Sequence, residues 1–364
     1  MQVGHRVDPA VRSAIHRGQP DVEQEGGKDG RTGSRFSFLS SRLPVDSFRG
    51  GASDGTRCVP SPPRWESNEA VKNEHTSASR TPALTPPESH VYLRGLARVS
   101  IKTAREIEQM RKSCQLAARV LEFIGPKIRP GVTTGQLDRL CHDFIVGHGA
   151  YPSPLNYRPK FSDQRYPKSI CASVNEVVCH GIPNGRVLEN GDIVNLDITT
   201  YLGGFHGDTN ATFFVGSPRA EAKRVVEVAR KCLDVGIAQV RPGARLGDIG
   251  AAIQEYAEGH RCSVVREFTG HGIGREFHED PHVPHFGVRG KGLRLQPGMT
   301  FTIEPMINGG DYAVEMLDDG WTVLTRDRSL SAQFEHTLLV TTSSVDVMTT
   351  RQCPLVNSEV GASE

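Results

Sequence analysis

The order of the elements predicted along this chain repeats once, and this repetition limits the possible folds more than any other feature. Apolar residues at helical spacing predict four helices, over about 103–124, 134–146, 218–239 and 247–258. Short strands are predicted after each pair of helices, over about 169–215 and 263–341. Helices, strands, helices and strands in this order predict an α/β fold, of the α+β kind, that is built from two related halves.

Two sequence motifs support this duplication, because they recur at similar offsets. Arg129-Pro130-Gly131 joins the first two helices, and Arg241-Pro242-Gly243 joins the next two, 112 positions later. A glycine lies six positions before Asp197, and another lies six positions before Glu304, which is 107 positions further along. A duplicated half would therefore bring Asp197 and Glu304 to related positions about a pseudo-two-fold axis.

Local signals indicate where the helices begin and which faces they bury. Thr103 and Glu106 have the spacing of a capping box at the start of the first helix, and Gly125-Pro126 ends that helix. The second helix is predicted to bury an apolar face that consists of Leu137, Leu140, Cys141, Phe144 and Ile145. Such faces supply the core of an ordered domain that we expect over residues 99–350.

Residues 1–98 differ in composition from the rest of the chain. They are rich in Arg, Ser, Gly and Pro, and no apolar periodicity in them lasts for two helical turns. Such a segment cannot bury enough apolar surface to offset its ordering entropy, so we expect a disordered extension. Its Arg and Ser content is compatible with organelle targeting, although Asp8, Asp21 and Glu23 depart from the acid-poor pattern of transit peptides. A flexible tail is expected over residues 351–364.

Charge, hydropathy and cysteine usage narrow the class of protein. The formal net charge is +1, which does not predict nucleic-acid binding, and no apolar run reaches about 18 residues, so no membrane span is predicted. The eight cysteines are scattered and form no C-x-x-C pair, a pattern typical of reduced thiols inside the cell. We therefore expect a cytoplasmic protein, with a mitochondrion or plastid as the alternative if the extension is a targeting segment.

A predicted β-hairpin brings two acidic residues together. With a two-residue turn at Gly203-Gly204, Thr199 lies opposite Asp208 and Asp197 lies opposite Asn210. Asp197 and Asp208 are then diagonal neighbours on one face of the hairpin, about 7–8 Å apart. Two buried carboxylates repel each other, and a cation between them removes that cost. The alternative is a solvated polar face on an edge hairpin, and this pair alone leaves both open.

Three further residues strengthen the case for metal binding. Glu304 and Glu335 lie beside apolar strands, and His271 lies among glycines that leave its ring open to a ligand. We expect each of them, and each aspartate of the hairpin, to close a short β segment. Taken singly, such residues are more often surface acids or structural histidines. Together, four carboxylates and one imidazole suit a pair of divalent ions such as Mn, Fe or Co, with Zn less exclusively, and four negative charges match two dications.

The motifs around these residues resemble those of a known family. They are Cys179-His180-Gly181-Ile182-Pro183, Asn195-Leu196-Asp197, His206-Gly207-Asp208-Thr209, Gly270-His271-Gly272-Ile273-Gly274, Phe301-Thr302-Ile303-Glu304-Pro305 and Ser331-Ala332-Gln333-Phe334-Glu335-His336. They closely resemble type I methionine aminopeptidases, over about residues 100–350. The resemblance implies the pita-bread fold, in which two α/β halves surround a two-metal centre. It also implies the metal ligands, which are Asp197, Asp208, His271, Glu304 and Glu335.

The same resemblance implies an activity. The N-terminal methionine of nascent proteins and peptides would be removed, with a preference for a small second residue, by a hydroxide that bridges two divalent cations of Co, Mn, Fe, Zn or Ni. Asp208 and Glu335 would each contact both ions. Glu304 would carry protons, His278 would hydrogen-bond the substrate carbonyl, and His180 would contact the nitrogen side of the scissile bond. A monomer is expected.

The resemblance further implies an apolar pocket for the methionine side chain. The matching positions are Cys171, Tyr157, Tyr166, Phe277 and Trp321. Sulfur packs favourably at aromatic edges, which suits a thioether substrate. This chain departs from the family between the two tyrosines, where Arg158–Arg165 make the segment about six residues longer. The extra residues leave open which tyrosine lies at the rim of the pocket, and we favour Tyr157.

The sequence leaves two alternative functions. An Xaa-Pro aminopeptidase shares the fold and the ligand types, but it carries a folded N-terminal domain that residues 1–98 do not resemble. A pita-bread binding module without metals is the other alternative, and the five filled ligand positions argue against it.

Overall fold

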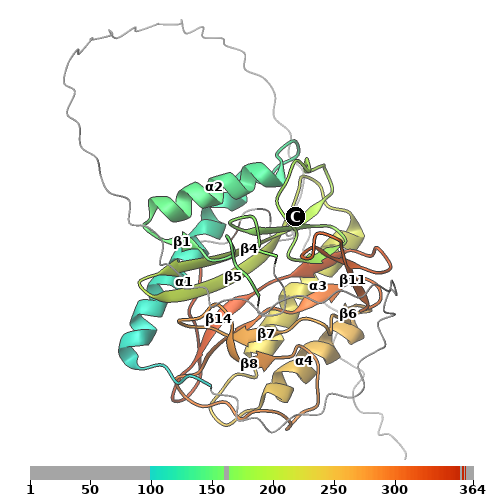
Figure 1. Cartoon of the computed structure of the whole chain (residues 1–364). Helices are drawn as coiled ribbons and strands as arrows, with labels where there is room; N and C mark the ends of the chain where they lie inside the picture. The colour runs from blue at the N-terminus through green and yellow to red at the C-terminus, as the bar shows by residue number, and fades with distance from the viewer. Residues whose placement is uncertain (1–98, 160–163, 353–354, 356, 358–364) are drawn as a thin grey trace, which may run out of the picture. The chain divides into compact units, whose positions relative to one another are not determined.

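The helices lie close to where the sequence predicts them. The computed structural model describes residues 99–159, 164–352, 355 and 357, so the predicted extension lies outside the described residues (Figure 1). The helices are α1 (Ala104–Ile124), α2 (Thr134–Gly147), α3 (Ala220–Ile237) and α4 (Leu246–Gly259), with a 3-10 turn, η1, at Gly125–Lys127. Within these described ranges, we find no helix that combines the length and the hydropathy needed to cross a bilayer.

The described strands of the first half form a sheet with the order β1-β4-β2, in which β5 also pairs with β4. Its strands are β1 (Tyr151–Pro152), β2 (Cys171–Val174), β4 (Ile193–Leu202) and β5 (Phe205–Phe214). The helix α1 packs on β4 and β5. A small sheet with the order β11-β12-β3 consists of β3 (Val177–Cys179), β11 (Val314–Met316) and β12 (Val323–Thr325), and it therefore links the two halves.

The second half contains two further sheets, which contact α3 and α4 (Figure 1). The larger has the order β15-β14-β9-β7-β8 and consists of β7 (Gly270–Gly272), β8 (Glu279–Val283), β9 (Thr300–Ile303), β14 (His336–Val340) and β15 (Val345–Val347). The smaller has the order β13-β10-β6 and consists of β6 (Ser263–Val264), β10 (Met306–Asn308) and β13 (Ser331–Gln333). Each half thus combines two helices with its own sheet.

The two halves make the same connection between helices, as the first repeated motif predicts. Gly131 and Gly243 have positive φ angles of 89° and 86°, which glycine adopts without strain. Gly131 donates its N–H to the carbonyl of Leu188 at 2.8 Å, and Gly243 donates to the carbonyl of Leu295 at 2.9 Å. Equivalent glycines therefore precede α2 and α4 with equivalent hydrogen bonds.

The second repeated motif marks the entry into an equivalent strand in each half. Gly191 and Gly298 have φ angles of 97° and 87°. Their N–H groups donate to the carbonyls of Val215 at 2.8 Å and Val340 at 2.9 Å. β4 begins two residues after the first of these glycines, and β9 begins two residues after the second. The duplicated α/β fold predicted from the sequence is therefore confirmed.

The predicted capping box is present, but one residue of the second helix is wrongly assigned. Thr103 Oγ1 accepts the N–H of Glu106 at 3.4 Å, and the Glu106 carboxylate accepts the N–H of Thr103 at 3.0 Å. The fully buried apolar residues of α2 are Leu137, Cys141 and Ile145. Leu140 is 36% exposed, so the prediction that it belongs to the buried face is wrong. The buried residues are four apart and form one stripe, and Leu140 lies to the solvent side of that stripe.

The predicted hairpin forms around Gly203-Gly204, and its register is the predicted one. Asp197 lies opposite Asn210, and Thr199 lies opposite Asp208. Each strand is ten residues long, so the prediction that the two aspartates close short β segments is wrong. The strands continue past the aspartates because β4 and β5 pair with each other over their whole length and pack against α1.

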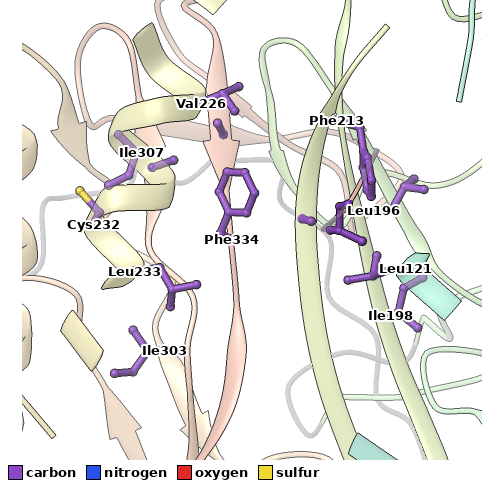
Figure 2. Packing of buried hydrophobic residues seen from close by; sticks show 14 of the residues in the cluster. Leu121, Leu196, Ile198, Phe213, Val226, Cys232, Leu233, Ile303, Ile307 and Phe334 are labelled. Atoms are coloured by element: carbon purple, nitrogen blue, oxygen red, sulfur yellow. The ribbon is translucent and has the colours of Figure 1, made fainter. Parts of the chain in front are cut away.

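One apolar core joins the two halves. Figure 2 shows Leu196 of the hairpin on one side of this core and Val226 and Leu233 of α3 on the other. Phe334 lies between these groups and is 4% exposed. Phe334 follows the last residue of β13 and precedes Glu335. Because the core holds Phe334, it also fixes the position of Glu335.

The helix α1 and the strand β5 approach each other closely at Gly207, directly before Asp208. A Cβ atom added at Gly207 would lie 2.3 Å from the backbone nitrogen of Cys114 and 2.6 Å from the carbonyl carbon of Ser113. Gly207→Ala must push the helix and the strand apart, and we expect it to lower the free energy of unfolding by about 1–3 kcal/mol. Gly147→Ala is the matched control, because a Cβ there meets no atom within 4 Å. Chemical denaturation measures both variants, and equal stabilities would contradict the close packing.

Candidate metal centre

Side chains from both halves of the fold converge on one point. Asp208 on β5, His271 on β7 and Glu335 after β13 offer ligand atoms that all lie within 4.8 Å of one another. The Nε2 atom of His271 lies 3.7 Å from an oxygen of Asp208 and 3.7 Å from an oxygen of Glu304. Asp197 lies within hydrogen-bonding reach of Asp208. The structure thus brings together all five residues that the sequence predicts as ligands.

The cluster is closed on one side and open on the other. Asp208, His271 and Glu335 are buried, with 3%, 7% and 1% of their surface exposed. Asp197 and Glu304 keep partial access to solvent. Asp197 and Glu304 are therefore the residues of the cluster that solvent reaches.

Hydrogen bonds from the hairpin hold carboxylates of both halves. Thr199 Oγ1 donates to Asp208 Oδ1 at 2.8 Å, and these two residues are the cross-strand pair described above. Asn210 Nδ2 donates to Glu335 Oε2 at 2.9 Å, and Thr209 Oγ1 donates to the Glu335 carbonyl at 2.7 Å. The hairpin therefore positions its own aspartate and also a glutamate of the second half.

Glu304 and His271 are held by groups of the second half. Thr302 Oγ1 donates to Glu304 Oε1 at 2.7 Å, and Gln333 Nε2 donates to Glu304 Oε2 at 3.2 Å. His271 Nδ1 lies 2.9 Å from the carbonyl oxygen of Gly272, and the nitrogen is the donor because a carbonyl only accepts. This tautomer leaves the lone pair of Nε2 free for a ligand.

Burial makes the ionised carboxylates costly. It raises the pKa of Asp197 to about 7 and the pKa of Glu304 to about 8. Burial, and then the neighbouring carboxylates, raise the pKa of Asp208 and of Glu335 well above the usual range. Burial also lowers the pKa of His271 to about 4, so its imidazole is neutral, the form that binds metals. The cluster therefore retains protons that a cation would displace.

The unpartnered atoms of the cluster fit a divalent metal. Asp197 Oδ1 and Glu335 Oε1 are buried and have no hydrogen-bond partner. Buried carboxylate oxygens without partners are costly, and a divalent cation would satisfy both of them. Four carboxylates and one neutral imidazole are a donor set that suits hard to borderline divalent ions.

The two predicted catalytic histidines lie near the open side. The ring of His278 is exposed, and its centroid lies 4.2 Å from that of His271. His180 has a positive φ of 57°, an uncommon and strained conformation for a residue other than glycine, and such strain is concentrated at functional sites. Burial lowers the pKa of His180 to about 4. Its ring contacts Phe268 at 5.3 Å and Trp321 at 6.3 Å, centroid to centroid.

Three of the residues predicted for the methionine pocket form one group. Cys171 pairs with Asp197 across β2 and β4, so both side chains lie on the same face of the sheet. The ring of Tyr166 packs edge-on against Trp321 at 5.1 Å. Tyr166 is 2% exposed, and its hydroxyl donates to the carbonyl of Gly181 at 2.9 Å. Tyr166 is therefore buried inside the domain.

The other two residues predicted for the pocket lie beside His278. The rings of Tyr157 and Phe277 are 5.0 Å apart, and Tyr157 lies 5.1 Å from His278. His206 stacks on the opposite side of this group, 5.5 Å from Phe277. Tyr157 is half-buried, so it is the tyrosine with access to solvent. This placement supports Tyr157 as the residue at the rim.

Backbone hydrogen bonds join the residues that flank the extra segment Arg158–Arg165. The N–H of Asn156 donates to the carbonyl of Tyr166 at 2.8 Å, and the N–H of Tyr166 donates to the carbonyl of Tyr157 at 2.9 Å. Residues 160–163 lie outside the described residues. The two tyrosines that flank the segment are therefore linked to each other by a backbone hydrogen bond.

Some residues that support the cluster were not predicted from the sequence. Gln333 and Thr302 each lie two residues before a glutamate of the cluster, and this two-residue spacing was an available signal. The bond from Asn210 to Glu335 joins the two halves, so only the tertiary structure reveals it. Phe268, which packs on His180, lies in no recognisable motif.

Comparisons with known proteins agree with this geometry. Residues 108–342 match metallopeptidase family M24. The methionine aminopeptidase of Salmonella typhimurium is 54% identical over 256 residues, which cover 70% of this chain and 95% of that protein. Methionine aminopeptidase A of Synechocystis is 51% identical over 252 residues, which cover 69% of this chain and 97% of that protein.

Solved structures give the same result. The crystal structure of methionine aminopeptidase from Rickettsia prowazekii has a TM-score of 0.67 and 51% identity, and the match covers 69% of this chain and 100% of that one. The enzyme from Thermotoga maritima has a TM-score of 0.67 and 38% identity, and the match covers 70% and 100%. A prolidase from Pyrococcus furiosus, with a TM-score of 0.55, 20% identity and coverage of 70% and 66%, shares only the fold. The chain therefore belongs to metallopeptidase family M24, and within that family to the methionine aminopeptidases.

Proposed function

We propose that this chain is a metal-dependent aminopeptidase that removes the initiator methionine from nascent proteins and peptides, with a small second residue preferred. The observation that carries the proposal is the buried cluster of four carboxylates and one neutral imidazole, which both halves of the fold complete. Relatives that are 54% and 51% identical carry the name methionine aminopeptidase, which supports the choice of substrate.

Two divalent cations are the proposed cofactors, and Asp197, Asp208, His271, Glu304 and Glu335 would hold them. When bound, such cations supply hydroxide near neutral pH and polarise a carbonyl oxygen. Charge supports the number, because four carboxylates neutralise two dications. Nitrogen and oxygen ligands accept Co, Mn, Fe, Zn and Ni, so the working metal would follow availability as much as affinity.

Glu304 is proposed as the proton carrier. Its carboxyl group has partial access to solvent, and Thr302 and Gln333 hold its two oxygens in place. A carboxylate that is held in place within reach of solvent can accept a proton and then donate it. Glu304 takes the proton released as water attacks the carbonyl carbon of the first peptide bond. It then delivers a proton to the nitrogen of the leaving amine.

His278 and His180 are proposed to bind the scissile peptide. A neutral imidazole has one N–H donor, and His278 lies at the open side of the cluster, where that donor reaches the substrate carbonyl and stabilises the developing oxyanion. His180 is held in a strained backbone conformation beside Trp321, and it contacts the nitrogen side of the same bond.

The methionine side chain is proposed to bind between the two groups of pocket residues. Cys171, Tyr166 and Trp321 form one wall, and Tyr157 and Phe277 form the other. Aromatic edges and a thiol provide favourable contacts for a thioether.

The chain is proposed to act as a monomer, because all five proposed ligands come from one chain. The cytoplasm is the proposed compartment. The six cysteines that the described residues contain are all free, which suits a reducing environment.

Replacing a shared ligand should remove activity without unfolding the protein. In Asp208→Asn, the side chain keeps its shape and its bond from Thr199, but it loses the negative charge that neutralises the cations. We expect turnover of Met-Gly-Met to be abolished and metal content per chain to fall, with little change in the circular dichroism spectrum. Asp234→Asn, at an exposed ion pair with Lys231, is the matched control and should retain both. Normal turnover by Asp208→Asn would refute the ligand assignment.

Substrate selection separates the proposed function from that of the prolidases that share the fold. The metal-loaded protein should release methionine from Met-Ala-Ser and leave Ala-Pro dipeptides intact, as product analysis by chromatography would measure. A bulky second residue, as in Met-Leu-Ser, should lower kcat/KM. Cleavage of Ala-Pro with Met-Ala-Ser left intact would replace the methionine assignment. Absence of both activities and of bound metal would favour a binding module.

Metal should stabilise the protein more as the pH rises. The unfolded chain releases its carboxyl protons near pH 4, whereas the metal-free folded state retains them up to a pKa of about 7 at Asp197 and about 8 at Glu304. The stability that these two carboxyl groups contribute to the metal-free protein is therefore lost from about pH 4 upward, until the pH passes these folded-state values. The rise in Tm on adding Mn²⁺ to EDTA-treated protein should be small near pH 5 and larger near pH 8. A pH-independent rise would show that these carboxyl groups do not bind the ion.

A further inference from the structure

Lys102, which precedes α1, holds the segment that carries Phe277 and His278. This segment lies between β7 and the first residue of β8. Lys102 Nζ donates to Glu279 Oε2 at 2.5 Å, and the two side chains are 2% and 15% exposed. Lys102 is itself fixed to the second half, because its N–H donates to the carbonyl of Gly298 at 2.8 Å. Lys102 thus contacts Glu279, the residue next to His278.

This segment makes few backbone hydrogen bonds, so its side chains determine its position. Between β7 and β8, Gly274 accepts a hydrogen bond from the N–H of His206 at 2.8 Å, and the N–H of Gly274 donates to the carbonyl of Glu276 at 3.2 Å. The N–H of Glu276 donates to Glu279 Oε1 at 3.2 Å. The Glu279 carboxylate therefore uses one oxygen to close the turn and the other to bind Lys102.

The packing around this ion pair leaves no room for adjustment. A Cβ atom added at Gly274 would lie 2.5 Å from Lys102 Cε, 2.7 Å from Lys102 Nζ and 2.7 Å from Glu279 Oε1. Removing one partner of a buried ion pair leaves the other charge without compensation, so the remaining partner moves toward water. At this site, the movement displaces Glu279 and with it the neighbouring His278.

We propose that Lys102 is a positioning residue for His278, and that it sets the distance between the His278 ring and the ligand cluster through the ion pair with Glu279. The two rings of His278 and His271 are only 4.2 Å apart, so a small displacement of the segment changes the distance from the His278 donor to a bound carbonyl oxygen. A misplacement of about 1 Å costs up to about a hundredfold in rate. This inference rests on the role proposed above for His278.

The test is a double-mutant cycle with Lys102→Met and His278→Ala in the metal-loaded full chain. Alone, Lys102→Met is expected to lower kcat on Met-Ala-Ser about tenfold or more, with KM within about twofold and metal content unchanged. In the His278→Ala background the same change is expected to alter kcat by less than about twofold, because the group that Lys102 positions is already absent. A purely structural role for Lys102 would give the full loss in both backgrounds and would overturn the inference.

Two further variants keep the result interpretable. Glu279→Gln removes the ion pair from the other side with little change in volume, and it must show the same dependence on His278 even if Lys102→Met folds poorly. Arg111→Met removes another half-buried ion pair on α1, with Asp346, and should retain kcat. If His278→Ala alone has normal kcat, the proposed role of His278 fails and the inference fails with it. If His278→Ala is impaired but the two losses multiply, only the inference about Lys102 fails.

Discussion

Asp197, Asp208, Glu304 and Glu335 converge in a region from which most water is excluded, and their mutual repulsion opposes folding. The raised pKa of each of these carboxyl groups measures that cost, and the two oxygens without a partner add to it. A bound divalent cation would remove both the repulsion between the carboxylates and the cost of the oxygens without a partner. Folding of the domain and metal binding are therefore linked, because the geometry that is costly without the ion binds it once it arrives.

The duplicated fold supplies the rigidity that this convergence requires. Each half contributes acidic residues on or beside a strand, and the hairpin of the first half holds a glutamate of the second. Asn210 and Thr209 of the hairpin bind Glu335, while one continuous core with Phe334 near its centre joins the halves on the opposite side. The cluster therefore lies where the two halves meet, and either half alone would present an incomplete set of ligands.

The open side of the cluster is built differently from the closed side. The ligands stand on or beside paired strands, whereas His278 stands on a segment that side chains hold in place, and His180 keeps a positive φ. The two residues proposed to bind substrate thus lie on less regular backbone than the proposed ligands. The residues that flank the longer segment Arg158–Arg165 are joined by a hydrogen bond from the N–H of Tyr166 to the carbonyl of Tyr157.

The sequence by itself determined the duplication, the helices, the register of the hairpin and the five residues of the cluster. Each of these depends on local spacing: capping residues, helical periodicity, a two-residue glycine turn, and short motifs that are typical of the family. Local spacing also placed Leu140 wrongly, because the direction of the sheet that α2 covers is not encoded in the helix. The lengths of β4 and β5 were missed for a similar reason, since strands extend as far as their partners allow. Only the tertiary structure decided which groups hold the ligands across the halves and which tyrosine is buried. It also decided that Lys102 binds Glu279, the residue next to His278. These contacts join residues more than a hundred positions apart, or depend on which of two similar side chains the packing excludes from water.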